Sequence, residues 1–351
     1  MKNITVLSVL VIIFFLFSAV SAHCREDLQA DEEWLQADNN NEKRKTRRYG
    51  FSILPQSGFV YGESFELVYP TNTKGEFLSE LIWDMKPVFY LGLQLYFERI
   101  DLMSAPGFFT SLDFKIGIPG DSGIIENRDW QSTENDALTD YSSHTNKTRS
   151  FYWLDFVIGA SLPVKNYFYV KPFISLSWMH FAFTGRDGYG VYARQTSRTT
   201  FLPIIDNPSL IFYHGQEVIR YQQDWFLAAV GLSIGTKILS PFHINLSFQI
   251  SPFTYCAARD DHLSVQFQDR WSDHRTYMDF TGWGLFIEPK GSISLKVKPL
   301  EFSLEFAWRH IGNTRGNTYS KIGNSQYFSQ SGEAGAGLSV MDSRFMTRIR
   351  F

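Results

Sequence analysis

The chain ends in a stretch, residues 345–351, in which apolar and polar side chains largely alternate and the last residue is aromatic. Alternation with a period of two indicates a β-strand whose two faces meet different surroundings. The same pattern returns at 243–251 and at 300–308. In the second of these, Glu301 and Glu305 share the polar face, which indicates a polar lumen if the other face meets lipid. The chain is therefore predicted to be all-β, with strands typical of barrels in bacterial outer membranes.

An export signal supports this interpretation and decides which face of the strands meets lipid. An apolar run over residues 6–20 follows Lys2 and precedes the small pair Ser21-Ala22, which predicts a signal peptide over 1–22. The run is short for a membrane-spanning helix. Amphipathic strands in an exported chain favour a membrane barrel over a soluble sandwich.

The segment that follows the signal peptide, 23–48, is polar and charged and has few apolar residues to bury. It is predicted to be a disordered leader, which leaves 49–351 as the barrel domain. The net charge of −3 excludes a strongly basic protein and gives no reason to expect a nucleic-acid partner. The two cysteines, Cys24 and Cys256, do not form a disulfide framework. No Cys or His cluster has the spacing of a metal site, so no cofactor is expected.

Turns and loops predict how many strands the barrel has. Four short turns containing Pro or Gly alternate with five long polar stretches, which gives ten antiparallel strands with both termini in the periplasm and the long loops outside. Strands of more than a dozen residues exceed the about 9–11 that a bilayer needs, so the surplus should form an extracellular rim. The short turns lie at 104–107, 163–166, 240–242 and 298–299, and the long stretches near 70–76, 121–149, 187–216, 260–276 and 312–334.

One pair of residues at this rim has the spacing and the chemistry of a general base with its supporting acid. Asp260 and His262 are two residues apart, so on a strand they share one face, roughly 6.5–7 Å apart along the chain. A carboxylate beside an imidazole supports a general base, although such a pair is also common on ordinary surfaces. Continuing the alternation of 244–250 would turn both side chains toward lipid. Either they lie above the bilayer, or a bulge near Pro252 shifts the register.

Six short motifs resemble those of the omptin family, which comprises ten-stranded outer-membrane endopeptidases with an extracellular active site. They occur in the family's order from about residue 60 to the C-terminus, which makes the resemblance specific although each motif alone is weak. The matching segments are Glu66-Leu67-Val68-Tyr69, Asn127-Arg128-Asp129-Trp130, Leu138-Thr139-Asp140-Tyr141-Ser142-Ser143-His144, Phe183-Thr184-Gly185-Arg186-Asp187-Gly188, Asp260-Asp261-His262 and Gly316-Asn317-Thr318.

The resemblance implies hydrolysis of surface or extracellular polypeptides by an activated water, without a covalent intermediate. By this likeness His262 is the base, Asp260 is its partner, and Asp129 holds the water from the opposite wall. Asn127 occupies the second position of that wall. Glu66 corresponds to one of two acids in a pocket for basic side chains. Polypeptides and outer-membrane lipid are the expected partners.

Three positions depart from the family's pattern. Asn127 stands where the family has an acid, and an amide can hold water but cannot accept a proton. Ala258 stands where the second pocket acid falls, so the preference for basic residues should weaken or change. Trp178 and His180 lie near the positions of the family's lipopolysaccharide-binding Glu and Arg, and no such lipid site is evident in the sequence.

Three functions therefore stay open at the level of the sequence. The first is an omptin-like protease with shifted specificity, favoured by the acids and the histidine that match the family. The second is a surface protein with impaired chemistry that acts as an adhesin or binding platform, favoured by Asn127 and Ala258. The third is a passive barrel or porin, disfavoured because small barrels are filled by side chains. Ion conductance in planar bilayers would identify the third.

Overall fold

The structure is a computed structural model that describes residues 47–351 apart from short internal segments. The predicted signal peptide, 1–22, and almost all of the predicted leader, 23–48, lie outside the described residues and stay predictions. The described part lacks 71–75, 102–106, 135, 166–167, 198–199, 207, 237–240, 264–265, 268–269, 272 and 298. No helix among the described residues is long and apolar enough to cross a membrane.

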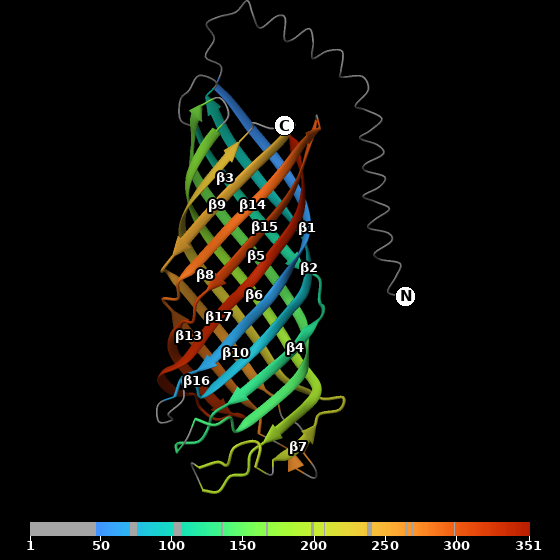
Figure 1. Cartoon of the computed structure of the whole chain (residues 1–351), viewed down its shortest axis with the longest axis vertical. Coiled ribbons are helices and arrows are strands. Elements are labelled where there is room, and N and C mark those ends of the chain that lie inside the picture. Colours follow the sequence, from blue (N-terminus) through green and yellow to red (C-terminus); the bar gives the residue numbers. More distant parts are fainter. Residues whose placement is uncertain are drawn as a thin grey trace, which may run out of the picture.

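All regular elements of the described chain are strands, and their pairings are antiparallel (Figure 1). Their bounds are β1 (Arg47–Val68), β2 (Ser79–Asp101), β3 (Gly107–Gly117), β4 (Gly120–Asp129), β5 (Asp140–Lys165), β6 (Phe168–Tyr192), β7 (Ser209–Phe212), β8 (Glu217–Thr236), β9 (Phe242–Ser251), β10 (Thr254–His262), β11 (Gln266–Phe267), β12 (Arg270–Trp271), β13 (Arg275–Gly282), β14 (Phe286–Val297), β15 (Leu300–Ile311), β16 (Arg315–Ile322) and β17 (Phe328–Arg350).

The strands close into a ring. β17 pairs with β1, and both β15 and β16 pair with β17, so the sheet has no free edge along most of its length. Four of the predicted long strands are each interrupted once: β3 continues as β4, β9 as β10, β14 follows β13, and β16 follows β15. Counted with these continuations, the ring has the ten antiparallel strands that the turns and loops predict, and the predicted barrel fold is confirmed.

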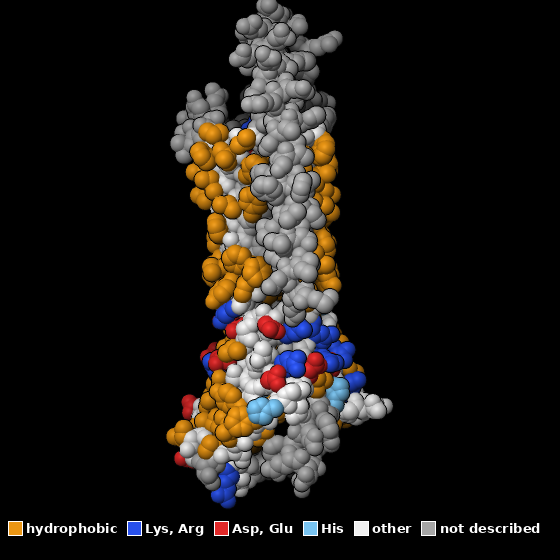
Figure 2. Space-filling view, turned by 90° about the vertical axis from the view of Figure 1, so that its right-hand side faces the viewer, with side chains coloured by type: hydrophobic (Ala, Val, Ile, Leu, Met, Phe, Trp, Pro, Cys, Tyr) orange, Lys and Arg blue, Asp and Glu red, His pale blue; other side chains and the backbone are white. Residues whose placement is uncertain are grey.

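The outer surface divides into an apolar band and a charged belt (Figure 2). Large apolar side chains such as Phe89 and Leu93 are exposed over the half of the barrel that holds the start of β1 and the end of β17. Nearer the other end, Lys86 pairs with Glu63 and Asp84, at 2.7 Å in each case. Lipid-facing charges are costly within a bilayer, so this belt marks the edge of the membrane-spanning part. The rim is the end beyond it, formed by β4, β7, β10, β13 and β16 (Figure 1).

Charged side chains fill the lumen of the membrane-spanning half. Arg344 donates to Glu305 over 2.8 Å and also pairs with Asp113, and Arg309 pairs with Glu288 at 2.5 Å. All five side chains are largely buried. Buried charges are tolerated when they are paired and hydrogen-bonded. The polar lumen predicted from the glutamates is confirmed, and it is a packed interior rather than an open channel.

An aromatic layer lies between this network and the rim. Trp83 stacks on Tyr221 with ring centroids 5.0 Å apart and on Phe183 at 5.6 Å, and all three side chains are buried. In the register Trp83 is level with Leu338, whereas Arg344 lies further from the rim on the same strand. The aromatic layer thus separates the charged lumen from the side chains of the rim.

The strand break at Pro252 turns the predicted base pair inward. On β8, Leu227 pairs with Thr254 and Val230 pairs with Ile250. A step of three residues along β8 therefore matches a step of four along the neighbouring strand. This extra residue is a bulge, and it moves the inward-facing set from odd positions in β9 to even positions in β10. The structure thus shows the register shift, and it also places β10 at the rim, beyond the membrane-spanning part (Figure 1).

Candidate active site

β10 presents an ion pair at the mouth of the barrel. Asp260 Oδ2 lies 2.6 Å from His262 Nε2, with Asp260 2% exposed and His262 46% exposed at the side chain. The imidazole meets Tyr277 edge to face at 5.5 Å. Burial acts to lower the pKa of His262, and the Asp260 carboxylate outweighs it, so the pKa is raised above its usual value. The contact at Nε2 leaves Nδ1 as the nitrogen that can accept a proton.

The wall formed by β4 carries the other predicted residues. Asn127 accepts a hydrogen bond from Ser79 at 3.2 Å and donates one to Asp129 Oδ2, also at 3.2 Å. Gln131 donates to the same carboxylate oxygen at 3.4 Å. Burial raises the pKa of Asp129, and these donors together with His262 reduce the rise without cancelling it. Asn127 thus orients the Asp129 carboxylate.

The two walls face each other across the mouth. At the rim the ring runs β1, β2, β4, β5, β6, β8, β10, β13, β16, β17, so β4 and β10 are separated by several strands in either direction. The charge of Asp129 nevertheless raises the pKa of His262, and the charge of His262 lowers that of Asp129. The charges of the base pair and of the β4 acid therefore influence each other across the mouth.

A second acid stands beside Asp129, and the sequence analysis did not assign it a role. Asp140 is paired directly across β4 and β5 with Asp129, and it is 6% exposed. Gln131 Nε2 donates to Asp140 Oδ2 at 2.8 Å and so links the two carboxylates. Burial and the charge of Asp129 raise the pKa of Asp140 to about 6. Asp140 lies within a motif quoted for the family resemblance, but only the strand register shows its partner.

Next to His262, the three buried acids Glu66, Asp260 and Asp279 form a cluster, which is the candidate for the acidic pocket that the resemblance implies. Their side chains are 3%, 2% and 6% exposed, and one carboxylate oxygen of each has no hydrogen-bond partner in the described structure. Burial, with the charges of Asp260 and Asp279, raises the pKa of Glu66 well above its usual value. Burial and the charge of Asp260 raise that of Asp279 to about 7. Unpartnered buried carboxylates suit a cationic guest.

Asp279 lies directly across from Ala258, the position at which the sequence lacks the second acid of the expected pocket. The two residues are direct cross-strand partners on β10 and β13, and both side chains face inward. The expectation of a weaker or different preference for basic residues stays a prediction, and Asp279 is a second buried acid beside Glu66. No local motif marks Asp279, because its neighbourhood depends on the pairing of β10 with β13.

Other residues of the quoted motifs lie away from the mouth. His144 is buried, and its Nδ1 donates a hydrogen bond to Asp187 O at 2.6 Å while its Nε2 shares one with Ser142 Oγ at 3.2 Å. Burial lowers the pKa of His144. Trp178 and His180 face outward, on the wall that meets lipid. In the described part of the chain no group of three or more His, Cys, Asp or Glu side chains is arranged to hold a metal ion.

Comparison with known proteins finds a family model and a crystal structure that match this chain. The family model described as Omptin matches residues 48–350. The crystal structure of the outer membrane protease OmpT from Escherichia coli is similar, with a TM-score of 0.74, 17% identity, and coverage of 88% of this chain and 99% of that chain. At this identity the likeness shows the fold. The transport unit of the autotransporter AIDA-I from Escherichia coli follows with a TM-score of 0.32, 10% identity and coverage of 88% and 91%.

No curated protein matches the chain in the corresponding search. The family model spans the described strands from β1 almost to the last residue. The similar crystal structure is covered over nearly its whole length, so the ring of strands is that of an outer-membrane barrel of this type. On the strength of both matches, the chain belongs to the Omptin family.

Proposed function

We propose that the protein is an outer-membrane endopeptidase that cleaves polypeptides next to basic residues by means of an activated water. The observation that carries the proposal is the Asp260–His262 pair at 2.6 Å, set opposite Asp129 and beside an acidic pocket. Membership of the Omptin family and the fold shared with a protease support it. The rim, with its long loops, would be extracellular and both termini periplasmic.

The reaction begins with a water held between the walls. His262 Nδ1 takes a proton from the water while its oxygen attacks the scissile carbonyl carbon. Asp260 stabilises the imidazolium through the Nε2 contact. Asp129 accepts the second hydrogen bond of the water and aims it. When the tetrahedral intermediate collapses, the proton moves from His262 to the leaving amine, and no bond forms between protein and substrate.

Asp140 supplies the ionisable carboxyl group that Asn127 lacks. An amide donates and accepts hydrogen bonds but holds no exchangeable acid proton near neutral pH. Asp129 and Asp140 are cross-strand partners whose pKa values are both raised. Two such carboxyls can share one proton, as like charges in one site avoid joint ionisation. We infer that the acid pair of this wall is Asp129 and Asp140, with Asn127 fixing the orientation of Asp129.

The acidic pocket sets the specificity. A Lys or Arg side chain of the substrate would enter beside Glu66 and Asp279 and give their unpartnered oxygens a charged donor. Because the pKa values of both acids are raised, binding of a cation should release protons. The pocket adjoins Asp260, so the bound basic residue would place its own peptide bond near the water.

A binding platform without catalysis is the alternative function, and it depends on whether the reaction needs an acid at the position of Asn127. If the acid at that position is indispensable, the mouth would still bind basic peptides through the acidic pocket. A passive channel is disfavoured by the packed charges and the aromatic layer of the described lumen.

The test is cleavage of fluorogenic peptides with Arg-Arg, Lys-Lys and Arg-Val sites by the refolded protein in detergent, with and without added lipopolysaccharide. His262→Ala should abolish cleavage. Asp261→Asn is the matched control, because Asp261 faces outward and pairs with Arg259 at 2.8 Å, so its activity should equal that of the wild type. Unchanged cleavage in His262→Ala would refute the mechanism. No cleavage by the wild type, but cleavage by Asn127→Asp, would favour the binding platform.

A further inference from the structure

A second hydrogen-bonded chain of a serine, a histidine and an aspartate lies on the outer wall, away from the mouth. Ser150 Oγ is 3.0 Å from His180 Nε2, and His180 Nδ1 is 2.9 Å from Asp224 Oδ1. Asp224 also accepts hydrogen bonds from Trp178 Nε1 at 3.3 Å and from Gln222 Nε2 at 3.1 Å. The order of atoms is that of a nucleophile, a base and an orienting acid.

The strand register places these side chains on three adjacent strands. His180 of β6 is paired with Tyr152 of β5 on one side and with Asp224 of β8 on the other. Ser150 stands two residues before Tyr152 on the same outward face. The contact is therefore built by cross-strand neighbours of a rigid sheet, a better scaffold for a site than a loop.

A bulge in β5 turns the serine outward. Thr148 and Phe151 are both buried, and the pairing slips between Thr148 and Ser150, so that Arg149 is an extra residue. The inward-facing residues Thr148 and Phe151 are therefore separated by two residues, Arg149 and Ser150, instead of one. Arg149 is exposed. Bulges often re-aim a side chain beside a site. Here the bulge sets a serine and a positive charge next to each other.

The site lies where the apolar band gives way to charge. Toward the membrane-spanning half, the next outward positions along β5 and β6 include Phe156, 39% exposed, and Leu176, 53% exposed. Toward the rim, the outward positions level with Thr184 are Lys147 and Arg220, both exposed. A lipid molecule at this boundary would have its phosphate beside the basic side chains and its acyl chains along the apolar wall.

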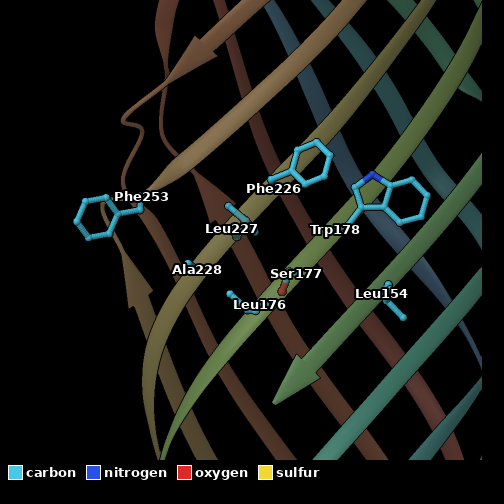
Figure 3. Close-up of a pocket in the computed structure, with 8 residues that line it drawn as sticks. All are labelled: Leu154, Leu176, Ser177, Trp178, Phe226, Leu227, Ala228 and Phe253. Carbon is cyan, nitrogen blue, oxygen red and sulfur yellow. The ribbon is translucent and has the colours of Figure 1, made fainter. Parts of the chain in front are cut away.

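An apolar groove of about 430 Å³ lies on the wall near the site (Figure 3). Trp178, two residues from His180, and Phe226, two residues from Asp224, form its end nearest the site. Figure 3 shows the groove residues spread over neighbouring strands of the wall. The groove is lined by Leu154, Leu176, Ser177, Trp178, Phe226, Leu227, Ala228 and Phe253. A single acyl chain is the occupant that fits an open, apolar surface groove in contact with lipid.

We propose that Ser150, His180 and Asp224 form a serine ester hydrolase site that acts on the acyl esters of membrane phospholipids. Ser150 Oγ attacks the ester carbonyl carbon, and His180 Nε2 takes the hydroxyl proton. The carbon–oxygen bond to the glycerol breaks, and His180 returns the proton to the departing alkoxide. Water then attacks the acyl-serine with His180 as base, which releases the fatty acid and restores Ser150. Arg149 supplies positive charge for the tetrahedral oxyanion.

This activity is independent of the proposed protease. The side chains of the outer site face lipid, whereas those of the mouth face inward across the lumen. Asp224 touches neither substrate nor water in this scheme and acts as a positioning residue for His180. The imidazole receives the serine proton at Nε2 because Nδ1–H donates to Asp224.

The test uses the refolded full chain in vesicles of phosphatidylethanolamine and phosphatidylglycerol, with release of fatty acid as the readout. Ser150→Ala should lower the rate on the order of 10³-fold or more, and His262→Ala should not change it. Ser143→Ala, an outward-facing serine of the same strand, is the matched control and should retain the rate. A fluorophosphonate probe should label the wild type at Ser150 and leave Ser150→Ala unlabelled.

Asp224→Asn gives a readout that a structural role alone would not move. The variant loses the carboxylate that accepts a hydrogen bond from His180 Nδ1, so kcat should fall while KM stays close to the wild-type value. The proposal is overturned if the wild type releases no fatty acid and takes no label, or if Ser150→Ala hydrolyses phospholipid at the wild-type rate.

Discussion

Replacement of Asp279 by Asn removes one carboxylate from the acidic pocket and leaves the size of the side chain unchanged. A hydrogen bond to a charged group contributes about 1.5–3 kcal/mol, and about 1.4 kcal/mol corresponds to a factor of ten in rate. We therefore expect kcat/KM for peptides with Arg or Lys at the cut to fall about 10- to 100-fold. The pKa of Asp279 is raised to about 7, so the loss should be larger at pH 8 than at pH 6.

The same substitution should stabilise the fold. The pKa of Asp279 is about 7 in the folded protein and about 3.9 in an unfolded chain. Between these values the folded protein binds the proton more tightly, so the ionisation of Asp279 lowers the free energy of unfolding as the pH rises toward 7. Asp279→Asn removes that loss, which is at most about 4 kcal/mol. Unfolding in guanidinium chloride at pH 5 and pH 8 should show a larger gain at pH 8, because only part of the loss has developed at pH 5.

A paired substitution separates the charge from its position. Ala258→Asp combined with Asp279→Ala returns the acid to the neighbouring strand, because the two residues are cross-strand partners. Cleavage of a peptide pair that differs only by Arg or Leu at the cut gives the ratio of kcat/KM in each variant. The double variant should restore the preference for Arg that Asp279→Asn loses. An unchanged Arg/Leu ratio in Asp279→Asn would refute the assignment of the pocket.

Three further outcomes are expected. Asp260→Asn should lower the rate about 100-fold or more. It should also move the acidic limb of the pH–rate profile to lower pH, because Asp260 is what raises the pKa of His262. Asp140→Asn should reduce kcat about tenfold or more with little change in KM, and adding Asn127→Asp should recover part of the loss. Arg344→Ala should destabilise the barrel by about 3–5 kcal/mol, measured by denaturant unfolding, because Glu305 and Asp113 lose their shared partner.

The sequence predicted those features that depend on neighbours along the chain. The spacing of turns predicted ten strands. Alternation predicted a polar lumen, because the polarity of each residue indicates the face of the strand on which it lies. The pair Asp260 and His262 was readable for the same reason, since a spacing of two puts both side chains on one face. The bulge near Pro252 was one of two alternatives that the sequence left open, because the alternation of residues 244–250 disagreed with the expected role of Asp260 and His262.

Features that depend on pairing between strands were missed. Asp279 and Asp140 are ordinary acids in the sequence, and the roles proposed for them depend on their cross-strand partners Ala258 and Asp129. The outer site is a stronger case, since its three residues come from β5, β6 and β8. A shift of one residue in any ladder would turn one of them inward. Register of this kind is fixed by the closed ring as a whole.

The central claim is that both walls of the mouth act on one water, and a double-mutant cycle tests it most directly. Cleavage of an Arg-Arg peptide would be measured for the wild type, His262→Ala, Asp129→Ala and the double variant. Groups that act as a unit are strongly non-additive, so each single variant should lose nearly as much kcat/KM as the double, on the order of 10³-fold. Losses that multiply in the double variant would show two independent walls and contradict the account.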